Sequence, residues 1–87
     1  MAKAKQYTIV GTRYSTGVQT RQTGTLEELI ECYRYTLECG KSWEHEKGNK
    51  KINLNPKTVK SLVTQINNAA NNSASNGYAD RYYELEA

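Results

Sequence analysis

The sequence predicts a small α+β domain in which a three-stranded antiparallel sheet carries two helices on one face. Three observations lead to this prediction: two strand-like runs near the start, two stretches with helical apolar spacing, and a third strand-like run near the end. The predicted order is β-β-α-α-β, with the final strand beside the first. At 87 residues the chain is expected to form one domain, residues 1–87.

The first two strands are predicted at residues 5–14 and 18–23. Ile9 and Val10 are β-branched and suit a pleated surface, and strand alternation places them on opposite faces. Gly17 can adopt the positive φ that a short hairpin loop requires. The pattern therefore predicts a β-hairpin at the start of the chain.

The final strand is predicted at residues 78–85. Alternation places Arg81 and Tyr83 on one face and Tyr78 and Tyr82 on the other. We therefore expect two tyrosines of this strand on the same face as each other and a third on the opposite face.

The first helix is predicted to begin at Thr25 and to stop at Gly40. Thr25 and Glu28 have the spacing of a capping box, in which each side chain bonds the backbone amide of the other. Gly40 suits the position just after a helix. One apolar stripe is formed by Leu26, Leu29, Ile30, Tyr33 and Leu37.

The second helix is predicted to open at Asn55 and Pro56, since asparagine is a favoured N-cap and proline a favoured first residue. We expect it to fray over residues 71–76 and to end at Gly77. Its apolar stripe comprises Val59, Leu62, Val63, Ile66, Ala69 and Ala70.

Residues 41–54 are predicted to form a long basic loop between the helices. Loops of this length in a small domain are usually functional or disordered. This one contains the only tryptophan and the only histidine of the chain. Residues 41–60 carry six lysines and two glutamates, a net charge of +4, whereas the whole chain has +3. The basic excess is therefore concentrated in one stretch.

We expect the functional surface at this loop and at the start of the second helix. Trp43 is the candidate anchor, because a large aromatic side chain can supply much of an interface's energy, and the lysines would steer an acidic partner. The alternative is that Trp43 seals the helix ends while the lysines only keep the protein soluble. The predicted binding residues are Trp43, Lys47, Lys50, Lys51, Lys57, Lys60, Tyr78, Arg81 and Tyr82.

The tyrosines indicate a contact surface. The chain has seven tyrosines and no phenylalanine, and tyrosine is enriched at interfaces. Tyr33 is expected in the core, but so small a domain cannot bury all the others. We therefore expect a homodimer or larger oligomer in which a sheet edge or face is covered by a neighbour. The alternatives are cross-strand aromatic pairs that stabilise the sheet, or a monomer whose aromatic face is kept for its target.

No pattern in the sequence indicates catalysis, a metal or a cofactor. The single histidine, His45, lies between two glutamates in a polar loop. Cys32 and Cys39 are seven residues apart, which on one helix is about 10 Å, too far for a disulfide. No apolar run approaches the roughly 20 residues that span a bilayer. We therefore expect a non-enzymatic, cytoplasmic protein that uses no cofactor, metal or membrane.

Two stretches resemble small accessory proteins of bacteriophages, of the host-takeover or anti-defence type. They are Thr25-Leu-Glu-Glu-Leu-Ile through Asn55-Pro-Lys-Thr-Val-Lys-Ser-Leu-Val-Thr-Gln-Ile-Asn-Asn, and the ending Gly77-Tyr to Tyr82-Tyr83-Glu-Leu. The resemblance implies an inhibitor in the host bacterial cytoplasm that binds or sequesters a defence component, either a protein or an anionic nucleotide. The alternative is a small nucleic-acid-binding protein that uses residues 41–60 and the tyrosine-bearing sheet.

Overall fold

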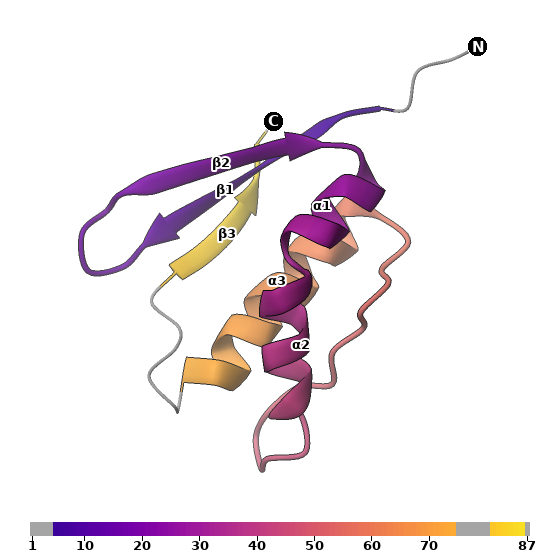
Figure 1. Cartoon of the computed structure of the whole chain (residues 1–87). Coiled ribbons are helices and arrows are strands. Elements are labelled where there is room, and N and C mark those ends of the chain that lie inside the picture. Colours follow the sequence, from indigo (N-terminus) through magenta and orange to yellow (C-terminus); the bar gives the residue numbers. More distant parts are fainter. Residues whose placement is uncertain (1–4, 75–80, 87) are drawn as a thin grey trace.

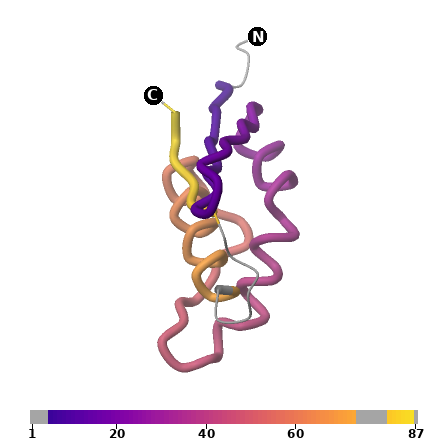
Figure 2. The backbone as a smooth tube through the Cα atoms, turned by 90° about the vertical axis from the view of Figure 1, so that its left-hand side faces the viewer, coloured from indigo at the N-terminus to yellow at the C-terminus, as the bar shows by residue number. Residues whose placement is uncertain are grey.

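The structure, a computed structural model, describes residues 5–74 and 81–86 and confirms the predicted α+β class. Three antiparallel strands form a sheet in the order β2-β1-β3, and the helices pack on it (Figure 1). Figure 2 shows α2 and α3 side by side below the sheet. The elements are β1 (Tyr7–Arg13), β2 (Gln19–Gly24), α1 (Leu26–Cys32), α2 (Arg34–Ser42), α3 (Val59–Ala74) and β3 (Arg81–Leu85).

The predicted hairpin and the pairing of the last strand with the first are both confirmed. β1 pairs with β2 through Ile9↔Gln22, and with β3 through Ile9↔Leu85. Gly17 has φ +73 in the turn between β1 and β2, a backbone conformation that favours glycine. The predicted strand at 78–85 is described only from Arg81, where β3 begins, so Tyr78 lies outside the described residues.

The first predicted helix is two helices, α1 and α2, with a break at Tyr33. The capping box of Thr25 and Glu28 is confirmed at the start of α1. At Tyr33 the backbone leaves helical geometry, with φ −104 and ψ 9. The break lies where the chain passes from α1, which contacts β2, to α2, which packs along α3.

The prediction that the helix stops at Gly40 is wrong. Gly40 lies inside α2, which continues to Ser42. A Cβ atom on Gly40 would collide with the backbone and side chain of Ala69 on α3. The glycine therefore permits a close approach of two helices. In the sequence, a glycine with this role cannot be told from a glycine that ends a helix.

The second predicted helix begins later than expected, at Val59. Thr58 acts as its N-cap: its hydroxyl accepts from the Ser61 amide at 3.1 Å. The Asn55 amide instead donates to the Asn53 side chain at 3.0 Å in a local turn. The predicted fraying of residues 71–76 is also wrong for the described residues, since α3 stays helical to Ala74.

One hydrophobic core joins the sheet to the three helices. Ile9 is the buried contribution of β1, whereas Val10 lies on the opposite face and outside this core. Tyr33 is buried as predicted, and its ring meets that of Tyr83 edge-on at 5.5 Å between centroids. The fully buried core side chains are Ile9, Leu29, Leu37, Leu62, Ile66 and Ala69.

Candidate binding site

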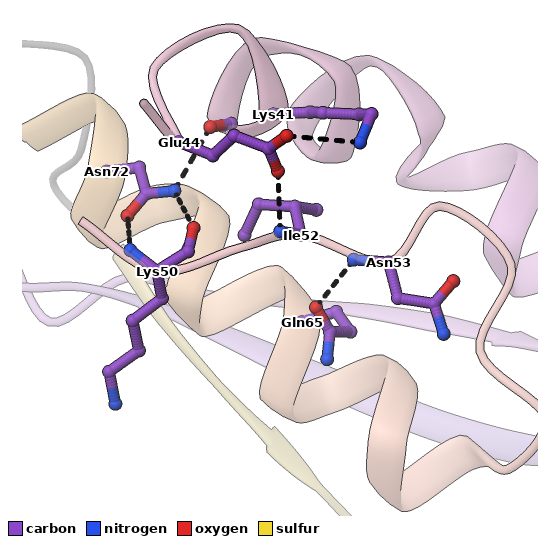
Figure 3. A network of polar contacts seen from close by, with 8 residues as sticks. Lys41, Glu44, Lys50, Ile52, Asn53, Gln65 and Asn72 are labelled. Atoms are coloured by element: carbon purple, nitrogen blue, oxygen red, sulfur yellow. Dashed lines mark hydrogen bonds and ion pairs between the residues drawn. The ribbon is translucent and has the colours of Figure 1, made fainter. Parts of the chain in front are cut away.

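Residues 47–53, called here the basic segment, lie between α2 and α3; they begin in a turn, closed by the Asn49 amide on the Glu46 carbonyl at 3.0 Å, and continue as an irregular stretch. The chain between these helices runs from the far end of α2 back along the helices to the start of α3 (Figure 1). The segment has no regular secondary structure, so its backbone groups need partners outside a helix or sheet. Three side chains provide them: Asn72 and Gln65 on α3, and Glu44 just after α2 (Figure 3).

Asn72 makes the strongest of these attachments. Its side-chain oxygen accepts from the Lys50 amide at 3.0 Å, and its Nδ2 donates to the Lys50 carbonyl at 2.7 Å. Nδ2 also donates to the carbonyl of Gly40 on α2 at 3.1 Å. The side chain of Asn72 is 1% exposed, so these bonds are shielded from water. One carboxamide therefore joins α2, α3 and the basic segment.

Glu44 and Gln65 hold the next residues along the segment. Glu44 Oε2 accepts from the Ile52 amide at 2.9 Å, and Gln65 Oε1 accepts from the Asn53 amide at 2.9 Å. Lys41 forms an ion pair with Glu44 at 3.3 Å. The Ile52 amide, and after it Lys41, hold the pKa of the Glu44 carboxyl below its usual value despite partial desolvation. Ile52 itself is buried in the core.

The lysines of the basic segment are exposed on this fixed backbone. The side chain of Lys50 extends away from Asn72 and Ile52 (Figure 3). Lys47, Lys50 and Lys51 are all exposed, and among residues 5–74 and 81–86 none of the three forms an ion pair. The arrangement presents Lys50 and Lys51 on a backbone held by interior hydrogen bonds, and Lys47 in the turn that precedes them.

Trp43 lies at the end of α2, next to the basic segment. It is half-buried, and its carbonyl accepts from Asn49 Nδ2 at 2.8 Å and from the Glu46 amide at 3.1 Å. The residue therefore closes the helix end through its backbone, and its side chain stays partly exposed.

The other two predicted lysines lie at the opposite end of α3. Lys60 is in the first turn of the helix and Lys57 precedes it. Twelve residues separate Lys60 from Asn72, which is about 18 Å along the axis. Both lysines are exposed, but the structure does not bring them together with the basic segment.

The predicted residues of the last strand form a third, separate group. Tyr82 lies on the face of the sheet away from the helices, where its ring contacts that of Tyr14 at 5.0 Å between centroids. Arg81, one residue earlier, is on the opposite face. The face that carries Tyr82 also carries Glu84 and an Arg21–Glu86 ion pair of 3.0 Å, so this face is not a basic surface.

Sequence reasoning missed the asparagines of α3 that bond to the backbone of other segments. Besides Asn72, Asn67 donates through Nδ2 to the Tyr83 carbonyl at 2.9 Å, and its Oδ1 accepts from the Tyr83 amide at 2.8 Å. Asparagine has a low propensity for helix interiors, so its presence inside a predicted helix indicates that its side chain bonds to something else. Each of these side chains bonds both the N–H and the C=O of one residue, as the backbone of a neighbouring strand would.

No family model matches the chain, and neither a curated protein nor a solved structure is detectably similar to it. In the described parts of the chain, no three His, Cys, Asp or Glu side chains gather as they would around a metal ion. No helix among these residues has the length and apolar character needed to cross a membrane.

Proposed function

We propose that this chain is a non-enzymatic binding protein, an inhibitor of the phage accessory type, that binds an acidic surface of a host protein. The observation that carries the proposal is the basic segment, where the exposed Lys50 and Lys51 stand on a backbone held by Asn72, Glu44 and Gln65, with the exposed Lys47 in the turn before them. Fixing the backbone before binding reduces the entropy lost on association. The exposed part of Trp43 supplies apolar area beside the charges.

A protein partner is favoured over a phosphate ligand because four amides of the segment, those of Asn49, Lys50, Ile52 and Asn53, are already engaged. Phosphate sites use convergent backbone N–H groups, but the amides of Lys50, Ile52 and Asn53 donate to side chains of the protein itself. Glu44 and Glu46 also lie beside the lysines, so residues 43–53 carry three lysines against two glutamates, a net charge of +1. Mixed charge of this kind suits a protein surface better than a polyanion.

The test is a charge reversal with a matched control at the other end of α3. The tagged wild type, Lys50→Glu/Lys51→Glu and Lys57→Glu/Lys60→Glu are incubated with nuclease-treated bacterial lysate, and bound proteins are identified by mass spectrometry. We expect an acidic protein to be retained by the wild type and by the Lys57/Lys60 variant, and to be lost with the Lys50/Lys51 variant. The lost binding should be reproduced with the purified partner and should weaken with salt.

Three results would contradict the proposal. Equal loss with both charge reversals would mean that only overall charge matters, and equal retention would place the binding surface elsewhere. Recovery of a nucleotide or nucleic acid in place of a protein would favour the other partner class. Circular dichroism of each variant checks that the fold is retained. We expect it to be, because all four lysines are exposed and make no hydrogen bond through their side chains to the described residues.

A further inference from the structure

The outer edge of β2 has backbone groups without partners. In an antiparallel pair, successive residues direct their N–H and C=O groups to alternate sides. Arg13 donates to the Val18 carbonyl, so the bonds between β1 and β2 fall at Val18 and every second residue after it. The amides and carbonyls of Gln19, Arg21 and Thr23 therefore point away from β1. Within residues 5–74 and 81–86, no hydrogen bond reaches these outward groups.

The other edge of the sheet is covered at its central outward residue, Tyr83. Glu86 donates to the Thr8 carbonyl, so by the same alternation Tyr83 directs its backbone groups away from β1. Asn67 bonds both of them, at 2.8 and 2.9 Å. A strand arriving at this edge would have to displace the Asn67 side chain, and covering an edge in this way prevents unwanted pairing.

The side chains of β2 leave its outer edge clear. Arg21, the only charged residue of β2, reaches across Val10 of the central strand to Glu86, at 3.0 Å between Nε and Oε1. Thr23 turns toward Thr8, with 2.8 Å between the hydroxyl oxygens. The usual protections of an edge, namely proline, a bulge or an outward lysine, are missing from the six described residues of β2.

We propose that β2 pairs antiparallel with β2 of a second copy, about a twofold axis at Arg21, to form a continuous six-stranded sheet. This register aligns Gln19 with the partner's Thr23 and Arg21 with the partner's Arg21, so that every outward group meets another. It forms about six backbone hydrogen bonds. The two guanidinium groups are drawn apart, since each pairs with Glu86 of its own chain. The dimer expected from the sequence thus has a defined surface.

A second copy fits this edge better than an unrelated extended peptide. Peptides that add to a sheet gain selectivity from pockets for alternate side chains. Here the first five residues of β2 are exposed and only Gly24 is buried, so the strand is not set in a groove. A copy of the same chain brings matched outward groups in a self-complementary order, which is what an isologous interface requires.

The first test is the mass in solution as a function of concentration. Light scattering and sedimentation of the wild type should give 19.8 kDa, twice the 9.9 kDa of one chain. Arg21→Pro removes the central outward N–H while leaving the β1–β2 bonds intact, and should give the monomer mass. Arg21→Ala is the matched control, because it loses the same ion pair but keeps the N–H, and it should remain dimeric. A monomeric wild type, or an Arg21→Pro variant that still dimerises, would overturn the proposal.

The second test uses the unmodified protein and does not depend on the proline variant folding. In the dimer the amides of Gln19, Arg21 and Thr23 should exchange slowly with solvent, like those of Thr20 and Gln22, which bond to β1. Dilution below the dissociation constant should restore fast exchange at the first three while the other two stay protected. If the three outward amides exchange fast at a concentration where the protein is dimeric, another surface forms the dimer and the proposal is wrong.

Discussion

The two edges of the sheet differ in a way that divides the molecule into a closed side and an open side. On the closed side, Asn67 bonds both backbone groups of Tyr83 at the outer edge of β3, and Asn72 bonds both backbone groups of Lys50 in the basic segment. On the open side, no side chain among residues 5–74 and 81–86 bonds the outward backbone groups of β2. Both asparagines belong to α3, so a single helix supplies the closure on its two flanks.

The comparison shows how a small chain can order extended segments without adding strands. A carboxamide carries an N–H donor and a carbonyl acceptor side by side, in nearly the geometry of a peptide group, so it can satisfy both backbone groups of one residue. Asn67 and Asn72 are five residues apart and point to different flanks of α3. On the closed side, side chains of the same chain bond the backbone groups. On the open side, the proposed partner for these groups is the β2 strand of a second copy.

The largest effect is expected from Asn72→Ala. The substitution removes three hydrogen bonds: the amide and carbonyl of Lys50 lose their Asn72 partner, whereas the Gly40 carbonyl keeps the Trp43 amide at 3.2 Å. We expect the free energy of unfolding to fall by about 3 kcal/mol, measured by urea denaturation. Asn71→Ala, at the exposed neighbouring position, is the control and should change it little. Equal losses at the two positions would show that the Asn72 attachments contribute nothing specific.

A smaller loss, with a change in association, is expected from Asn67→Ala. Two hydrogen bonds to Tyr83 disappear, at a cost of about 2 kcal/mol. The edge of β3 then becomes as open as that of β2, so species larger than a dimer should form at high concentration, as seen by sedimentation. Asn68→Ala is the matched control. If Asn67→Ala stays the same size as the wild type, Asn67 does not guard the edge.

Most of the fold could be predicted from the sequence because local patterns determine it. The hairpin follows from β-branched alternation and Gly17, and the start of α1 from Thr25 and Glu28. These signals act over a few residues and involve side chains next to the backbone they bond. The place of the last strand beside the first followed from economy of connection, and the pairing of β1 with β3 confirms it.

The rest of the fold depends on contacts between distant residues. Gly40 matches the pattern of a helix stop, but its lack of a side chain serves a contact with Ala69, 29 positions later. Asn55 and Thr58 are both acceptable helix caps, and the turn between Asn53 and Asn55 leaves Thr58 in the role. For the candidate site, the sequence located the lysines through its charge distribution. It could not show that Asn72 holds the backbone of Lys50, because these two residues are 22 positions apart.

We expect the free energy of unfolding to fall in alkali because of the buried Tyr33. Burial, and then the neighbouring Tyr83, raise the pKa of Tyr33 from 10.0 to about 12. The folded state therefore holds its proton more tightly than the unfolded state. This contribution is fully present below pH 10 and is lost between pH 10 and 12, amounting to about 2 kcal/mol. Urea denaturation at a series of pH values should show this decline in the wild type and a shallower one in Tyr33→Phe. Parallel curves would contradict the assignment.

The smallest effect is expected in acid, at Glu44, a titratable group that bonds to the backbone of the basic segment. The Ile52 amide lowers the pKa of Glu44, so the folded state stabilises the carboxylate. That contribution is present above the unfolded value near 4.5 and is lost as the pH falls through the lower folded value. In Glu44→Gln, the acid decline in stability should be shallower, because a neutral amide can still accept from Ile52 at every pH. Gln65 bonds the next amide, that of Asn53, without titrating, so Gln65→Glu provides the converse: it should add acid sensitivity. Exchange of the Ile52 and Asn53 amides, followed from pH 6 to pH 3, distinguishes the two variants. If acid loosens the Ile52 amide equally in the wild type and in Glu44→Gln, ionisation of Glu44 does not hold the segment, and the neutral side chains of Asn72 and Gln65 fix its backbone.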